Sequence, residues 1–131
     1  MTERTRAGGC ACGQLRVTTR GEPDRVGICH CMTCRKTTGS VLSVFVIFPK
    51  DRVRIDGRYE GWESSPGDRR CFCPVCGSQV FEFSGDEVEV KAGTFDDPNT
   101  VAPSYETWIV RREHWLPPTG LPTYTHNRGG S

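Results

Sequence analysis

The sequence lacks the features that direct a protein to a membrane or to nucleic acid. Its longest apolar run, VLSVFVIF at residues 41–48, is too short to span a bilayer. The N-terminal stretch MTERTRAGG is polar, and no apolar segment of a signal peptide follows it. The 17 basic and 16 acidic side chains nearly cancel, so the net charge of +1 provides no field that would attract nucleic acid or an anionic membrane. We therefore expect a soluble, cytoplasmic protein that binds neither.

The sequence is also short of apolar residues. Only 35% of its 131 residues are hydrophobic, which is below the usual share for a globular domain. A chain of this length still buries roughly two-thirds of its unfolded surface and is expected to form one domain. We place that domain at residues 8–124 and expect loose termini at 1–7 and 125–131, because both ends are polar. The modest core indicates that something besides apolar burial contributes to stability.

Short strand-like segments separated by turns and prolines make up most of the chain. Residues 42–48 are β-branched and aromatic, which predicts a central strand covered on both faces. Residues 79–93 predict a hairpin around a Ser-Gly-Asp turn, and the Asp-Gly pair at 56–57 could turn a second hairpin. A further strand is expected at 104–110, and one helical turn is expected at 33–39, closed by a glycine. The fold class is therefore mainly β, with antiparallel sheets.

Eight cysteines are the most unusual feature of the composition. In a secreted protein this number would indicate four disulfides, but a reducing cytoplasm argues against them. The cysteines fall into three short-spaced groups: Cys10 and Cys12; Cys29, Cys31 and Cys34; and Cys71, Cys73 and Cys76. Short spacings bring several sulfur atoms to one point, which is what a metal ion requires. We therefore expect metal binding rather than disulfides.

Two of these groups can combine into a closed metal site. In CPVCG, Cys73 and Cys76 project from a tight turn, and the glycine that follows permits a positive φ. In CACG, Cys10 and Cys12 supply two further sulfur atoms. Four thiolates around one ion are typical of structural zinc. We call these four residues the first cluster and expect them to tie the N-terminal strand to a distant turn, which would stabilise the fold.

The motif CHCMTC contains a second set of candidate metal ligands, with three cysteines instead of four. In an extended strand Cys29 and Cys31 point to one side and His30 to the other, so His30 is expected to be a surface or packing residue rather than a ligand. Cys34 can curl back toward Cys31 in a turn. We call Cys29, Cys31 and Cys34 the second cluster. Three protein ligands with a vacant fourth position are typical of catalytic zinc.

Cys71 is the one cysteine outside both sets. It lies two residues before Cys73, so in a strand the two sulfur atoms would face the same side. It could complete the second cluster, remain idle near the first, or be a buried free thiol. We favour the idle thiol; a fourth ligand in the second cluster would weaken the case for catalysis there.

The motifs GGCxCGxLR, CHCxxCRKxTG, FCPxCGS, GTFDDP and RREHWLPPTGLPTY follow one another over about residues 8–124. In this order they resemble the glutathione-dependent formaldehyde-activating enzyme family, also called the centromere-protein-V/formaldehyde-activating domain. The resemblance implies a β-tent fold, similar to that of a small zinc-binding chaperone of Rab GTPases. It also implies two zinc ions per chain, a structural one in the first cluster and a catalytic one in the second, in agreement with the spacings.

The second cluster could carry out chemistry on a thiol. A substrate thiolate suits the vacant position of such a zinc, because metal binding lowers the pKa of a thiol. The thiolate could then attack an aldehyde. We therefore expect a carbon–sulfur lyase resembling S-(hydroxymethyl)glutathione synthase, which adds a thiol such as glutathione to formaldehyde or a related small aldehyde. Arg35 and Lys36 could bind carboxylates of the thiol, although a role as solvated basic side chains explains them equally well. The alternative is a non-catalytic zinc-binding protein-interaction module with a filled fourth position.

Overall fold

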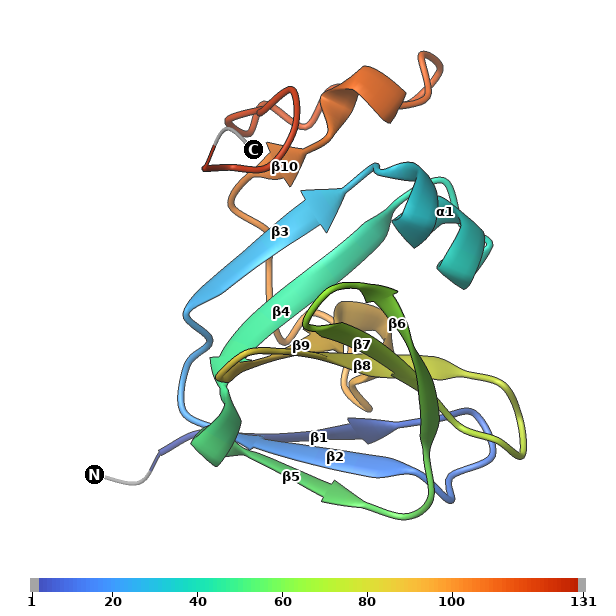
Figure 1. The fold of residues 1–131 in the computed structure, drawn as a ribbon. Coiled ribbons are helices and arrows are strands. Elements are labelled where there is room, and N and C mark those ends of the chain that lie inside the picture. The colour runs from blue at the N-terminus through green and yellow to red at the C-terminus, as the bar shows by residue number, and fades with distance from the viewer. Residues whose placement is uncertain (1–2, 130–131) are drawn as a thin grey trace.

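Two β-sheets and one short α-helix make up the computed structural model, which describes residues 3–129 (Figure 1). The smaller sheet has three strands, in the order β1 (Thr5–Gly9), β2 (Arg16–Arg20) and β5 (Val53–Asp56). The larger sheet has seven, in the order β10 (Glu106–Thr107), β3 (Arg25–Cys29), β4 (Ser43–Pro49), β9 (Glu87–Lys91), β8 (Gln79–Ser84), β7 (Asp68–Phe72) and β6 (Glu60–Ser65). Neighbouring strands are antiparallel except β10 and β3, which are parallel. The predicted mainly β fold class is confirmed.

The helices are short and lie at the ends of strands. Helix α1 (Met32–Thr38) follows β3, and three single 3-10 turns occur at η1 (Lys50–Arg52), η2 (Ala92–Thr94) and η3 (Ile109–Arg111). Gly39, at φ 74°, ends α1 in the left-handed region, which confirms the helical turn and its predicted stop. None of the helices within residues 3–129 has the length and apolar character that crossing a bilayer would need.

The hydrophobic core lies between the two sheets. Because side chains alternate across each strand, only one face of each sheet points into this core. Val46, Val90 and Phe81 occupy neighbouring positions on β4, β9 and β8, and all three are fully buried in this core. The alternate residues, such as Ile47 and Glu89, form the opposite face of the larger sheet, which we call the cavity face. The residues 42–48 therefore form an internal strand as predicted, with one face on the core and the other on the cavity face.

The hairpin predicted at residues 79–93 is confirmed as β8 and β9. Ser84 pairs with Glu87 beside the turn, and this register places Glu82 directly opposite Glu89. The second predicted hairpin, at 56–57, is wrong. β5 pairs with β2 and β6 pairs with β7, so this segment carries the chain from the smaller sheet to the larger one.

The side chain of Gln14 explains why the Asp-Gly pair does not turn a hairpin. Its Nε2 donates to the carbonyl of Arg58 at 2.7 Å, and its Oε1 accepts from the Arg58 amide at 3.0 Å. Both polar groups of the Arg58 backbone are thereby satisfied by a side chain, in place of a strand partner. The chain then continues to β6 and the larger sheet.

The strand predicted at 104–110 is mostly wrong. Only β10 is extended, and Trp108, at φ 57°, enters the left-handed region and starts the turn η3. The backbone amide of Trp108 instead bonds to the carbonyl of His126 at 3.0 Å. The strand therefore stops because the chain after it packs against residues near the C-terminus.

The expected loose termini are also partly wrong. Residues 5–7 belong to β1, and buried Arg6 donates to the Gly21 carbonyl at 3.0 Å and to Glu22 at 2.9 Å. Near the other end, the guanidinium of Arg128 lies 4.7 Å from the ring centre of Tyr105. Polar segments are ordered here by hydrogen bonds and a ring contact rather than by apolar burial. Residues 1–2 and 130–131 lie outside the described part of the chain.

Candidate functional site

The four sulfur atoms of the first cluster converge between the two sheets. Cys10 and Cys12 lie in the turn between β1 and β2, whereas Cys73 and Cys76 lie in the turn between β7 and β8. All four sulfur atoms lie within 4.8 Å of one another. The Cys10–Cys12 separation is 3.6 Å and the Cys12–Cys73 separation is 3.8 Å. The cluster can therefore hold a metal ion that links the smaller sheet to the larger one.

Neighbouring donors prepare these cysteines for metal binding. The amide of Leu15 donates to Cys10 Sγ at 3.3 Å, and Gln14 Nε2 donates to Cys73 Sγ at 3.0 Å. Hydrogen bonds from the side chain and backbone of Ser78 lower the pKa of Cys76 to about 5. The bonds to Cys76 favour its thiolate, which is the form that binds metal, and the other donors orient the sulfur atoms that they contact.

The second cluster is formed where β3 runs into α1. Cys29 ends the strand, Cys31 caps the helix and Cys34 lies in its first turn. The amide of Cys34 donates to Cys31 Sγ at 3.3 Å. The three sulfur atoms lie within 4.8 Å of one another, and no His, Asp or Glu within residues 3–129 completes this group. The second cluster therefore offers three protein ligands.

The thiols of the second cluster ionise differently because they share hydrogen bonds. The pKa of Cys31 is lowered to about 2, mainly because the Cys29 and Cys34 thiols donate to it. The same contacts, together with burial, raise the pKa of Cys29. A cation at this position would remove this conflict, because each thiolate could then be paired with positive charge.

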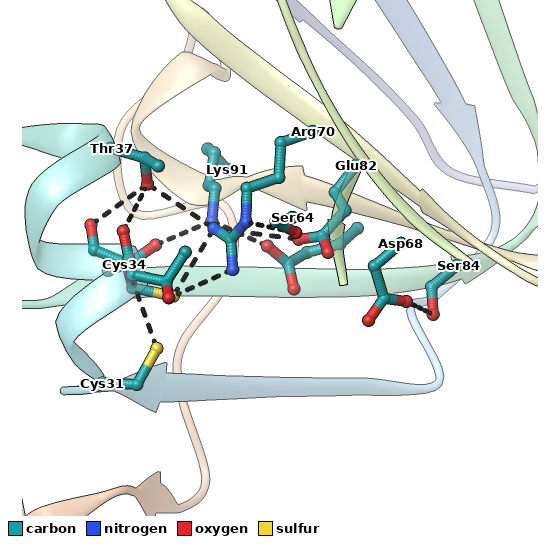
Figure 2. Close-up of polar contacts among 12 residues, drawn as sticks. Cys31, Cys34, Thr37, Ser64, Asp68, Arg70, Glu82, Ser84 and Lys91 are labelled. Atoms are coloured by element: carbon teal, nitrogen blue, oxygen red, sulfur yellow. Dashed lines mark hydrogen bonds and ion pairs between the residues drawn. The ribbon is translucent and has the colours of Figure 1, made fainter. Parts of the chain in front are cut away.

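A buried arginine lies against the second cluster. The terminal nitrogens of Arg70, on β7, lie 3.8 and 3.9 Å from Cys34 Sγ, and its Nε donates to Ser64 Oγ at 3.1 Å (Figure 2). Its positive charge contributes to the lowered pKa of Cys31. Sequence reasoning missed Arg70, because its place beside Cys34 depends on how β7 sits relative to α1.

A cavity of about 380 Å³ opens beside the second cluster. A row of cross-strand neighbours on the cavity face lines it: Arg70, Glu82, Glu89, Ile47 and Arg25, on β7, β8, β9, β4 and β3. Directly opposed residues on antiparallel strands face the same side of a sheet. Two carboxylates, Glu82 and Glu89, stand opposite one another in this row, a pairing that is destabilising unless the surroundings compensate for it. The predicted hairpin already contained this pairing, because its turn sets the register.

Residues near the C-terminus cover the other side of the cavity. Tyr105, Trp108, Asn127 and Arg128 all line it, and the indole nitrogen of Trp108 donates to Asn127 Oδ1 at 2.8 Å. A second cavity, of about 290 Å³, shares Cys31, Arg70 and Trp108 with the first. The second cluster is therefore accessible from two cavities that meet beside Cys31.

The two basic residues expected to bind substrate lie elsewhere. Arg35 pairs with Glu113 at 2.6 Å and donates to the carbonyl of Arg111 at 3.0 Å, and it lines neither cavity. Lys36 is exposed on α1 and also lines neither. The residues that follow Cys34 in sequence are thus directed away from the cavity by the helix.

Cys71 belongs to neither cluster. Its side chain is fully buried in the hydrophobic core, and burial raises the pKa of its thiol to about 11. It corresponds to the buried free thiol rather than to a ligand. It is an internal reference for substitutions of the other cysteines, because it lies two residues before Cys73 but belongs to neither cluster.

His30 points away from the second cluster, into the body of the protein. It is fully buried, and its Nε2 lies 2.8 Å from Glu106 Oε1 on β10. Glu106 also accepts a hydrogen bond from Thr119 at 2.6 Å and lies 3.6 Å from Arg112. Burial raises the pKa of Glu106, but the hydrogen bonds from Thr119 and His30 outweigh this effect and lower it. The His30–Glu106 contact thus connects β3 to the residues that cover the cavity.

We expect His30→Ala to lower the free energy of unfolding by about 3 kcal/mol, because it removes a buried ring and one hydrogen bond to a buried carboxylate. His30→Gln, which retains a donor, should cost less. Urea unfolding of both variants at neutral pH measures this difference. Bound metal, measured in parallel, should be unchanged. Loss of metal by a folded His30→Ala variant would contradict the structural role.

Comparison with known proteins identifies the family of the chain. No curated protein matched the sequence. Residues 5–111 match the family model described as glutathione-dependent formaldehyde-activating enzyme, and this region contains every cysteine of the two clusters. The match covers well over half of the chain, and so the chain belongs to the glutathione-dependent formaldehyde-activating enzyme family.

Proposed function

We propose that the protein is a zinc-dependent carbon–sulfur lyase. It would add a small thiol such as glutathione to formaldehyde, or to a related small aldehyde, and cleave the S-hydroxymethyl adduct in the reverse direction. The observation that carries this proposal is the three-cysteine cluster beside a cavity of about 380 Å³. Family membership supports the pairing of glutathione with formaldehyde.

Zinc suits both clusters. A tetrahedral zinc with sulfur ligands about 2.3 Å away separates neighbouring sulfur atoms by about 3.8 Å. The measured separations of 3.6 and 3.8 Å in the first cluster fit this requirement. Four thiolates would give a closed, structural site, whereas Cys29, Cys31 and Cys34 would leave one position for a substrate. We therefore propose two zinc ions per chain and assign the catalytic role to the second cluster.

When bound there, zinc would keep a substrate thiol ionised at neutral pH. Residues of the chain would balance the charge around this zinc. Three thiolates outweigh a divalent cation, and the buried guanidinium of Arg70 beside Cys34 offsets the excess negative charge. The cavity can bring thiol and aldehyde together beside the cluster, so that the sulfur can attack the carbonyl carbon.

Arg128 replaces Arg35 and Lys36 as the proposed contact for a carboxylate of the thiol. It lines the cavity and lies over the ring of Tyr105, and no carboxylate within residues 3–129 forms an ion pair with it. Arg25, which lines the cavity from β3, is already paired with Glu87 at 2.9 Å. Arg128 therefore has donors available for an anionic ligand.

The test is to measure thiol–aldehyde exchange with zinc-loaded protein. We expect NMR exchange spectroscopy to show interconversion of free formaldehyde and S-hydroxymethylglutathione above the spontaneous rate. Glutathione bound to the zinc-loaded protein should also be present as the thiolate at neutral pH, because zinc stabilises that form. Metal-free protein is the control for both measurements.

Mercaptoethanol, a thiol without carboxylates, is the matched control for recognition. Any preference for glutathione over mercaptoethanol should be reduced in Arg128→Ala. Zinc absorption spectroscopy that reveals four protein ligands, unchanged by every thiol in a broad panel, would rule out the proposed chemistry. Such a result would favour the non-catalytic protein-interaction module.

A further inference from the structure

We propose that Glu82 is the catalytic acid–base residue of the second cluster: its carboxylate takes the proton of the incoming thiol and returns it to the oxygen of the adduct. This inference rests on the proposed function and adds a step to it. Neither the cysteine motifs nor Arg70 can move this proton. The ligands are occupied by the metal, and an arginine remains protonated throughout the accessible pH range.

Glu82 lies in the cavity, next to the arginine that contacts the second cluster. It lies on β8, lines the cavity and is 7% exposed. Arg70 Nη1 lies 4.0 Å from Glu82 Oε2 and 3.8 Å from Cys34 Sγ (Figure 2). One guanidinium nitrogen thus joins the carboxylate to the cluster, and a substrate sulfur beside Cys34 would lie on the same side of the sheet as Glu82.

Glu82 is also the acidic group of the cavity that is free to exchange a proton. Within residues 3–129 its carboxylate makes no hydrogen bond, and its ion pair is the 4.0 Å contact with Arg70. Its cross-strand neighbour Glu89, by contrast, accepts a bond from Lys91 at 2.7 Å, and Lys91 is held in addition by Ser43 at 3.1 Å. Glu89 is committed to a buried ion pair, whereas Glu82 retains its acceptor capacity.

Burial and the charges around Glu82 bring its pKa close to neutral pH. Burial and the negative charge of Glu89 raise its pKa to about 7, with a smaller contribution from Asp68, while Arg70 and Lys91 oppose this rise. The charged groups therefore face it from both neighbouring strands, β7 and β9. A carboxyl that is half ionised near neutrality is efficient as both acid and base.

The atoms of the reaction balance with Glu82 as the single proton carrier. The thiol gives its proton to the carboxylate and becomes a thiolate. Its sulfur forms a bond to the carbonyl carbon, and the π electrons of the C=O bond move to the oxygen. The protonated Glu82 then donates to that oxygen, giving the hydroxymethyl group and restoring the carboxylate. No oxidant, reductant or further reactant is required.

The kinetic test compares Glu82→Gln with Glu60→Gln, which makes the same change at an exposed site on β6. We expect kcat to fall about 100-fold or more in Glu82→Gln, with metal content and glutathione affinity retained. In the wild type, kcat/KM should rise with pH and level off near the pKa of Glu82, because its ionised form accepts the proton. This plateau should be absent in Glu82→Gln and present in Glu60→Gln. Glu82→Asp, which keeps a carboxyl group, should recover part of the rate.

Difference infrared spectroscopy supplies a readout that does not depend on turnover. Adding glutathione to zinc-loaded wild-type protein at about pH 8 should produce a protonated-carboxyl band, because Glu82 takes the thiol proton. The band should be absent in Glu82→Gln. If that variant does not fold, the band in Glu82→Asp should instead be shifted in frequency. A wild-type spectrum without this band overturns the role of Glu82.

The two proposals fail in different ways. If the wild type accelerates exchange and Glu82→Gln retains both its rate and its pH plateau, the role of Glu82 is overturned and the proposed function stands. If zinc-loaded wild type never exceeds the spontaneous rate, the proposed function is overturned, and the role of Glu82 falls with it.

Discussion

Cys73→Ser is expected to abolish stable folding. Cys73 is fully buried, and its sulfur accepts bonds from Gln14 and from the amide of Val75 at 3.0 and 3.4 Å. Structural zinc sites contribute about 10–16 kcal/mol of apparent binding free energy, whereas a whole domain is stable by about 5–15 kcal/mol. Removing one ligand therefore removes an amount comparable with the total. Circular dichroism during heating, with zinc analysis of the soluble fraction, measures the effect.

Cys71→Ala is the matched control for this prediction. It removes a fully buried thiol two positions from Cys73, but one that belongs to neither cluster. We expect a loss of roughly 1–2 kcal/mol and two retained zinc ions, because only core packing is affected. If Cys73→Ser melts at the same temperature as Cys71→Ala, the first cluster is not what holds the two sheets together.

Cys31→Ser is expected to remove catalysis while preserving the fold. Cys31 caps α1 through a bond from the Cys34 amide to its side chain. A serine hydroxyl can accept the same bond, since serine is a preferred capping residue, so the helix should persist. The second cluster, however, would retain only two thiolates. Zinc should fall by one ion per chain, and thiol–formaldehyde exchange should return to the spontaneous rate.

Two measurements decide this second prediction. Thermal unfolding of Cys31→Ser should remain within a few degrees of the wild type, in contrast to Cys73→Ser. Cys71→Ala should keep both its zinc ions and its exchange activity. A Cys31→Ser variant that unfolds like Cys73→Ser would show that both clusters are structural, and one that remains fully active would remove the second cluster from the mechanism.

The cysteine pairs within each cluster could be predicted from sequence because their geometry is local. Cys73 and Cys76 share one turn, and Cys31 and Cys34 share one helical cap, so short spacings already bring the sulfur atoms together. The direction of His30 followed from strand alternation in the same way. The hairpin of β8 and β9 was likewise determined by its turn and by the alternation of its residues.

The remainder of the site depends on contacts between distant segments. Arg70 and Glu82 meet through the pairing of β7 with β8, and Arg128 reaches the cavity by packing on Tyr105. A substrate contact for Arg35 rested on its nearness to Cys34 in sequence and was no better supported than a solvated role; Glu113, 78 residues later, pairs with it instead. Such partners become visible only when the strand order and the path of the C-terminal segment are known.

The two sides of the cavity come from different parts of the chain. The cysteines, Arg70 and Glu82 lie within the region matched by the family model, residues 5–111. Asn127 and Arg128, which cover the opposite side together with Tyr105 and Trp108, lie beyond it. On the proposed function, the reacting groups and the proposed carboxylate contact would then lie in separable segments of the chain. Exchanging the segment after residue 111 would then change which thiol is admitted while the chemistry beneath it stays intact.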